Sequence, residues 1–151
     1  MFKNILLATD GSAASEQAVA MAVGLARTHQ ARLVAVYVVD PYPYLGIGDT
    51  NLAGFNAYMA AAQEHAAQAH AEVAQRCAEG GAAVDLDVVL VEEAGVTAGI
   101  LATARQRGSD LIVIGSHGRS GVDRIVLGSV AVKVVAQSAV PVLVVRGAHT
   151  P

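Results

Sequence analysis

The segment LIVIGSHGRSGVDRIVLGS, residues 111–129, decides the fold class. It opens with the continuous apolar run Leu111-Ile112-Val113-Ile114 and continues into a stretch that contains four glycines. A continuous apolar run is typical of a strand that is buried on both faces of a parallel sheet. Because a helix is predicted to begin at Ser129, the segment predicts a buried strand, a long connection and a helix.

The same alternation runs along the whole chain. Further runs rich in leucine and β-branched residues predict strands over residues 5–8, 33–39, 84–91 and 140–145. Helices are predicted between the strands, over residues 15–30, 55–79, 96–107 and 129–137, with Ser12 or Ser15 as the N-cap of the first. Strict alternation of strand and helix predicts an α/β fold, a parallel sheet with helices on both faces and right-handed crossovers.

Length and composition indicate one globular domain over residues 1–151. A domain of this size buries roughly 68–70% of the surface that its unfolded chain exposes, which is enough for an ordinary core. With 54% hydrophobic and 15% charged residues, the chain is typical of soluble globular proteins. The net charge of −3 is small and scattered, which argues against a nucleic-acid partner.

The sequence predicts a cytoplasmic protein without membrane insertion. Residues 125–145 are long enough to span a bilayer, but they contain Lys133, Gln137 and Pro141, and their pattern changes from helix to strand. The apolar run near the N-terminus is too short for a secretory signal. Cys77 is the single cysteine, so no internal disulfide can form, which fits a reducing compartment.

The glycine segment has the spacing G-x2-G-x9-G-S, formed by Gly115, Gly118, Gly128 and Ser129. Glycine lets a ligand approach the backbone closely, because it has no Cβ. The start of the last helix presents free N–H groups and the positive end of the helix dipole, which favour a phosphate. Ser129 is expected to cap that helix and to donate its hydroxyl to a phosphate oxygen.

The glycines alone also fit a plain connection without a ligand. The segment lacks the Gly-Lys-Ser/Thr triplet of P-loop proteins, and no Gly-x-Gly-x-x-Gly follows the first strand. From the pattern alone, a phosphate site and a long connection are therefore about equally supported.

The spacing resembles the nucleotide-binding signature of the universal stress protein family, whose UspA-like, ATP-binding members carry G-x2-G-x9-G-[ST]. The resemblance extends along the chain. It includes a first strand that closes in Asp10-Gly11-Ser12, the segment DLIVIG at residues 110–115 and the terminal PVLVV at residues 141–145.

This resemblance implies a Rossmann-like fold of the adenine nucleotide alpha hydrolase type, with the strand order 3-2-1-4-5. In that order the first and fourth strands are neighbours, and ligands bind at such a switch point. The resemblance places Ala8, Thr9 and Asp10 against adenine and ribose, and the backbone of Val38 against adenine. The residues that it implies around the phosphates are Gly115, Gly118, Arg119, Gly128, Ser129 and Val130. Asp10 also fits a turn residue before Gly11.

The function that the resemblance implies is binding of ATP, AMP or another adenine nucleotide, accompanied by Mg or Mn, by a homodimeric stress-response regulator. The homodimer would form through the edge strand Val140 to Val145, because an exposed apolar edge needs cover. Two alternatives stay open. One is a slow ATP hydrolase or nucleotidyl-transfer enzyme, although no catalytic residue stands out. The other is a protein-interaction module whose nucleotide site is vestigial.

The remaining candidates are histidines, a cysteine and a loop. His117 lies in the glycine segment and fits either a phosphate contact or a solvent-facing side chain. His65 and His70 are five residues apart, which is wrong for a metal pair on a helix, so both are expected on the surface and no metal ligands are predicted. Cys77 is expected to be a small buried hydrophobe. Residues 40–54 are long for a connection and fit either a lid or a mobile surface loop without a role.

Overall fold

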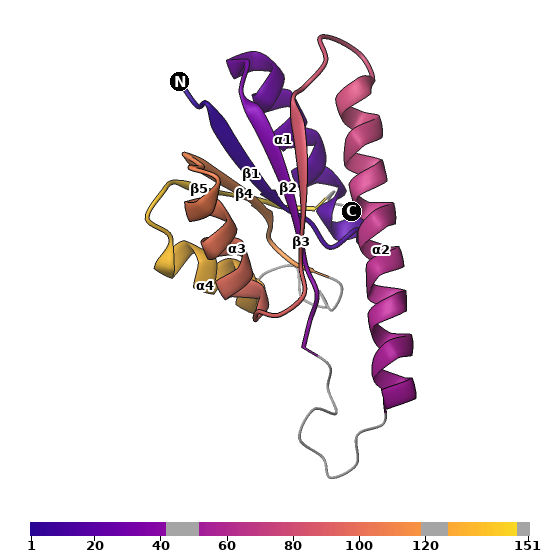
Figure 1. Cartoon of the computed structure of the whole chain (residues 1–151). Helices are drawn as coiled ribbons and strands as arrows, with labels where there is room; N and C mark the ends of the chain where they lie inside the picture. The colour runs from indigo at the N-terminus through magenta and orange to yellow at the C-terminus, as the bar shows by residue number, and fades with distance from the viewer. Residues whose placement is uncertain (42–51, 119–126, 148–151) are drawn as a thin grey trace.

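The computed structural model describes residues 1–41, 52–118 and 127–147. Within these residues a parallel sheet has the strand order β3-β2-β1-β4-β5. The strands are β1 (Asn4–Ala8), β2 (Arg32–Val38), β3 (Leu86–Val91), β4 (Leu111–Gly115) and β5 (Val142–Val145) (Figure 1). The predicted order and parallel pairing are confirmed.

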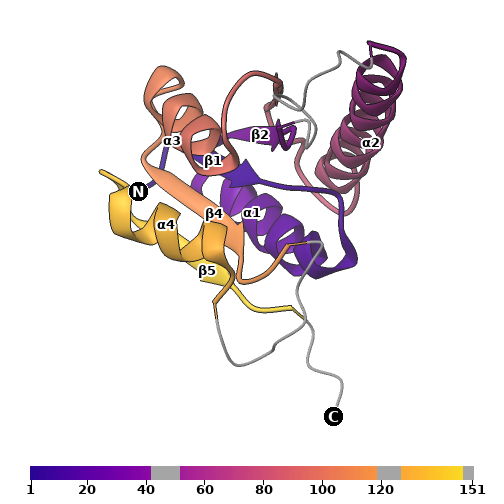
Figure 2. The ribbon, with the colours of Figure 1, turned by 90° about the horizontal axis from the view of Figure 1, so that it is seen from below.

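Helices cover both faces of the sheet, as predicted. They are the short 3-10 helix η1 (Ala13–Ser15), α1 (Glu16–His29), α2 (Leu52–Ala78), α3 (Val96–Gln106) and α4 (Ser129–Gln137). Helices α1 and α2 lie on one face, and α3 and α4 lie on the other (Figure 2). Neither Ser12 nor Ser15 makes a side-chain cap at the start of η1 or α1.

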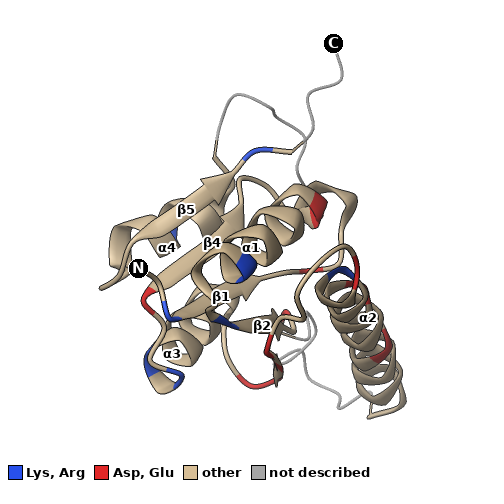
Figure 3. Ribbon diagram, turned by 90° about the horizontal axis from the view of Figure 1, so that it is seen from above, with Lys and Arg blue, Asp and Glu red and all other residues tan. Residues whose placement is uncertain are grey.

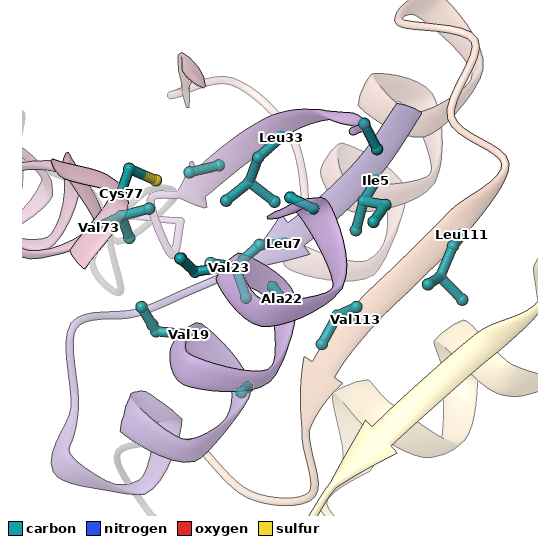
Figure 4. Close-up of a cluster of buried hydrophobic side chains, with 14 residues drawn as sticks. Ile5, Leu7, Val19, Ala22, Val23, Leu33, Val73, Cys77, Leu111 and Val113 are labelled. Atoms are coloured by element: carbon teal, nitrogen blue, oxygen red, sulfur yellow. The ribbon is translucent and has the colours of Figure 1, made fainter. Parts of the chain in front are cut away.

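The core has two layers because side chains alternate along each strand. Ile5 and Leu7 of β1 point toward α1 and α2, where Val23 and Cys77 are also buried (Figure 4). Leu6, between them, points toward α3 and α4. The prediction that Cys77 is a buried hydrophobe is confirmed, and burial raises the pKa of its thiol.

The two edge strands are shorter than predicted. Strand β5 begins at Val142 rather than at residue 140, because the Ser138 hydroxyl donates to the Val140 carbonyl and accepts from the Val140 N–H, which holds Val140 in a turn. Strand β3 begins at Leu86 rather than at residue 84, and its Val88 and Leu90 are exposed. Strand β3 is thus covered less completely than the central strands, in keeping with its position at the edge of the sheet.

Basic and acidic residues are interspersed along the helices and loops (Figure 3). In the part of the chain that the structure describes, no helix combines the length and apolar character that a membrane crossing requires.

Candidate functional site

A cavity of about 870 Å³ opens at the carboxyl ends of β1 and β4. These two strands are paired, with Ala8 opposite Ile114, although more than one hundred residues separate them in the chain. From this pair the sheet continues to β2 on one side and to β5 on the other, so the cavity lies at the switch point of the strand order.

Most of the residues predicted for the site line this cavity. They are Ala8, Thr9, Asp10, Val38, Gly115, His117, Gly118, Gly128, Ser129 and Val130. Arg119 lies outside the residues that the structure describes, and so does most of the predicted lid, residues 42–51. The structure thus brings together ten predicted residues from β1, β2, β4, α4 and their loops.

Asp10 forms the turn after β1. Its Oδ1 accepts a hydrogen bond from the Ser12 N–H at 2.9 Å, and the intervening Gly11 has a φ of +72°, in the left-handed region that favours glycine. The turn role considered for Asp10 is therefore present. The other carboxylate oxygen faces the glycine segment, since a Cβ added to Gly118 would lie 2.9 Å from Oδ2.

The glycine segment packs tightly against the start of α4. The Gly128 N–H donates to the Ser116 carbonyl at 2.7 Å, and a Cβ on Gly128 would lie 3.0 Å from that oxygen. Gly128 is also the N-cap of α4, and no side chain caps the helix. The expectation that Ser129 is the cap is wrong, because Gly128 already has the extended backbone of a cap and Ser129 is the first helical residue.

The first turn of α4 offers unpaired backbone donors to the cavity. Its first intrahelical bond runs from the Val132 N–H to the Gly128 carbonyl at 3.0 Å. The N–H groups of Ser129, Val130 and Ala131 precede that bond and so have no acceptor within the helix. All three residues line the cavity, and the positive end of the helix dipole adds to their attraction for an anion.

His117 is half-buried beside these donors. Its Nδ1 lies 3.1 Å from the hydroxyl oxygen of Ser116, and its Nε2 is buried without a hydrogen-bond partner among the described residues. A ring that simply faces solvent does not fit these contacts. Ser116 was not predicted as a site residue, because a lone serine after a strand carries no distinguishing pattern.

Helix α2 supplies a wall of the cavity that the sequence did not predict. Tyr58, Ala61, Ala62 and His65 line it, and the Tyr58 hydroxyl donates to the Asp40 carbonyl at 2.7 Å. His65 is exposed, as expected, but it belongs to the cavity wall. The position of α2 along the sheet decides which of its residues reach the cavity. Hydrophobic periodicity predicts the helix but not this position.

His70 is not the surface residue that was expected. It is half-buried, and its ring meets the ring of Tyr37 edge-on at a centroid distance of 6.5 Å. Burial lowers the pKa of His70, while the backbone of Ala35 and Val89 opposes this shift more weakly. The spacing of five residues correctly predicted that His65 and His70 lie on different faces of α2. It did not indicate that the face with His70 packs against the sheet.

Charged side chains are scarce in the described part of the cavity wall. Its acidic residues are Asp10 and Asp40, and it contains no lysine or arginine. Across residues 1–41, 52–118 and 127–147, no group of three or more His, Cys, Asp or Glu side chains is arranged to hold a metal ion. An anion in this cavity would therefore be met by N–H groups rather than by a described cation.

Comparisons with known proteins agree with the fold. Residues 1–146 match the model of the Universal stress protein family. A universal stress protein of Methanocaldococcus jannaschii is 33% identical over 147 residues, which cover 97% of this chain and 83% of that protein.

Solved structures agree as well. UspA from Lactobacillus plantarum is 30% identical and superimposes with a TM-score of 0.77, over 95% of this chain and 97% of that chain. A universal stress protein solved in complex with cAMP is 25% identical, with a TM-score of 0.61 over 97% of this chain and 98% of that chain. On the family match over nearly the whole length, this chain belongs to the universal stress protein family.

Proposed function

We propose that this protein binds an adenine nucleotide, ATP or AMP, in the cavity at the carboxyl ends of β1 and β4. The observation that carries the proposal is that residues from four separate segments, each predicted for a nucleotide site, line one cavity of about 870 Å³. The universal stress protein in complex with cAMP supports an adenine nucleotide as the ligand.

The two ends of the cavity suit the two ends of a nucleotide. The phosphates would lie at the start of α4, against the N–H groups of Ser129 and Val130. The base would lie beside Val38, where Val96 and Ile100 add an apolar wall. Asp10, between these ends, would accept hydrogen bonds from the ribose.

A magnesium or manganese ion would accompany the phosphates. Because the described residues contain no ready cluster of metal ligands, the ion would take its oxygen ligands mainly from the phosphates and water. The residues present therefore fit a metal that arrives with the nucleotide rather than a resident ion.

The protein would act as a stress-response regulator in the form of a cytoplasmic homodimer. The edge strand β5 supports this proposal, since Val142–Val145 are only half-buried. The neighbouring α4 supports it too, because Val132 and Val135 are 47% and 48% exposed. Apolar surface on a sheet edge is normally covered, and a second copy of the chain would cover it.

The substitution Gly118→Val tests the nucleotide site. Its side chain would enter the space beside Oδ2 of Asp10, so we expect ATP binding, measured by titration calorimetry, to be lost while the far-UV circular dichroism is unchanged. Gly24→Val is the matched control, because a Cβ on Gly24 meets nothing within 4 Å. Wild-type affinity in the Gly118→Val variant would contradict the assignment of this cavity.

A further inference from the structure

Ser116 connects the end of β5, the start of α4 and His117. It is 3% exposed. Its N–H donates to the Val145 carbonyl at the end of β5 at 2.8 Å, and its carbonyl accepts from the Gly128 N–H at 2.7 Å. Its side chain reaches His117, with 3.1 Å between Oγ and Nδ1. The backbone of Ser116 thus fixes the segment after β4, and among the described residues its hydroxyl contacts only His117.

The burial of Ser116 decides which atom donates in the contact with His117. If Nδ1 carried the ring proton, it would donate to Oγ, and the hydroxyl hydrogen would need another acceptor. Among the described residues no other acceptor contacts Oγ. Each tautomer leaves one donor without a partner among the described residues: the Ser116 hydroxyl if Nδ1 is protonated, or Nε2–H if Nε2 is protonated. Ser116 is 3% exposed whereas His117 is only half-buried, so a ligand in the cavity reaches the histidine donor more readily, and this favours a hydroxyl that donates to an unprotonated Nδ1.

A neutral imidazole with an unprotonated Nδ1 carries its proton on Nε2. That nitrogen is buried and has no hydrogen-bond partner in the part of the chain that the structure describes. His117 lines the cavity next to the start of α4, since a Cβ on Gly128 would lie 3.5 Å from the His117 Cα. His117 therefore lies at the end of the cavity where the backbone donors of α4 gather.

We propose that Ser116 holds the neutral His117 ring in the tautomer protonated on Nε2, and that Nε2–H donates to a phosphate oxygen of the bound nucleotide. This inference rests on the proposed function. Ser116 is then a positioning residue and His117 a binding residue. The donor needs no positive charge on the ring, which suits a cavity wall whose described part contains no lysine or arginine.

The tautomer is tested in the free protein by nitrogen NMR of histidine labelled with 15N. We expect Nε2 of His117 to be protonated and Nδ1 to be unprotonated in the wild type, and we expect Ser116→Ala to change the Nδ1 signal. Ser109→Ala is the matched control: Ser109 is also buried, but it lies just before β4 and its hydroxyl has no partner among the described residues. A proton on Nδ1 in the wild type would overturn the inference.

The contact with the phosphate is tested by calorimetric titration with ATP. We expect Ser116→Ala and His117→Asn to bind ATP about tenfold more weakly, as for the loss of one hydrogen bond to a charged acceptor. His117→Gln should restore most of the affinity, because its amide nitrogen reaches the position of Nε2, whereas that of Asn reaches only the position of Nδ1. Ser109→Ala should bind as the wild type does.

The outcomes separate this inference from the proposed function. If the wild type binds ATP and both Ser116→Ala and His117→Asn bind equally well, the inference is overturned and the proposed function stands. If the wild type binds neither ATP nor AMP, both are overturned. Circular dichroism of each variant confirms that a loss of affinity is not a loss of fold.

Discussion

At the scale of single residues, Gly99 determines how closely α3 approaches the cavity. A Cβ on Gly99 would lie 2.9 Å and 3.0 Å from the two methyl carbons of Val38. Val38 is stiff because it is β-branched, and it is the residue expected beside the base. We expect Gly99→Ala to lower the free energy of unfolding by about 1–3 kcal/mol, the range for overpacked cores.

Chemical denaturation of a double-mutant cycle checks this prediction. Val38→Ala removes the two nearest of the three methyl groups that the new Cβ would meet, and leaves that of Val91 at 3.3 Å, so most of the cost of Gly99→Ala should disappear in the Val38→Ala background. Gly24→Ala is the control, because its Cβ meets open space in α1. That change should stabilise the protein by up to about 1 kcal/mol. An equal cost of Gly99→Ala in both backgrounds would contradict the account.

His70 should make stability depend on pH. Burial lowers its pKa in the folded protein below the ordinary value of 6.5. As the pH falls below 6.5, His70 becomes protonated in the unfolded chain but stays neutral in the folded protein. The free energy of unfolding therefore falls until the pH passes the pKa of His70 in the folded protein. Above 6.5 this contribution to stability is fully present.

The variant His70→Phe keeps a ring against Tyr37 and removes the titration. We expect the loss of stability between about pH 7 and pH 5, measured by denaturant unfolding, to be smaller in His70→Phe than in the wild type. His65→Phe, an exchange at an exposed position of the same helix, should keep the wild-type slope. Identical slopes in the wild type and in His70→Phe would show that His70 does not titrate on unfolding.

At the scale of elements, α2 is held at its C-terminal end by Arg27 of α1. The Arg27 guanidinium donates to the carbonyls of Arg76, Cys77 and Ala82 at 2.9, 3.0 and 3.1 Å, and to that of Glu79. The last carbonyls of a helix have no intrahelical partner, so this side chain satisfies groups that would otherwise need water. One arginine thus fixes the end of α2 against α1.

Removing Arg27 should destabilise the protein and fray the end of α2. We expect Arg27→Ala to lower the free energy of unfolding by about 1–3 kcal/mol, and Arg27→Lys to recover only part of it, because lysine lacks the planar fork of donors. Amide hydrogen exchange over residues 74–78 should also accelerate. Arg105→Ala, at an exposed position of α3, is the control. Wild-type stability and exchange in Arg27→Ala would contradict this role.

The identity of the elements could be predicted because hydrophobic periodicity reflects burial directly. Apolar runs located all five strands, and Gly80-Gly81 located the end of α2. Positions set by contacts between elements could not be predicted. One of these is the turn at Ser138, which makes β5 begin two residues later than predicted, and another is the burial of His70. Each depends on a contact that hydrophobic periodicity does not show.

At the scale of the whole molecule, the strand order brings the candidate site together. Pairing of β1 with β4 places the Asp10 turn opposite the glycine segment. The sequence predicted this arrangement through the family resemblance, since alternation of strands and helices does not fix the strand order. It did not predict the wall made by α2, because a helix of 27 residues can cross a sheet at many registers.

The proposed homodimer depends on the outer edge of β5, the last strand of the sheet in the described residues. The carbonyls of Pro141 and Val145 accept hydrogen bonds from Ile112 and Ser116, on the side of β4. Backbone groups alternate along a strand, so the N–H of Val144 points to the outer edge. Val144→Pro should therefore remove a donor from the interface without breaking the pairing with β4.

Light scattering coupled to size-exclusion chromatography measures this effect. We expect the wild type and the control Val144→Ala to have twice the chain mass of 15.4 kDa at micromolar concentration, and Val144→Pro to have the mass of one chain. A wild type of 15.4 kDa, or a Val144→Pro variant that remains dimeric, would contradict an interface built on this edge.

The central claim is that the cavity at the switch point holds an adenine nucleotide, and a crystal structure of the protein grown with ATP and magnesium tests it most directly. We expect the phosphates to lie against the N–H groups of Ser129 and Val130 and the base to lie beside Val38. A nucleotide bound elsewhere, for example in the groove lined by Glu16 and Arg76 between α1 and α2, or an empty cavity in crystals saturated with ATP, would contradict the account.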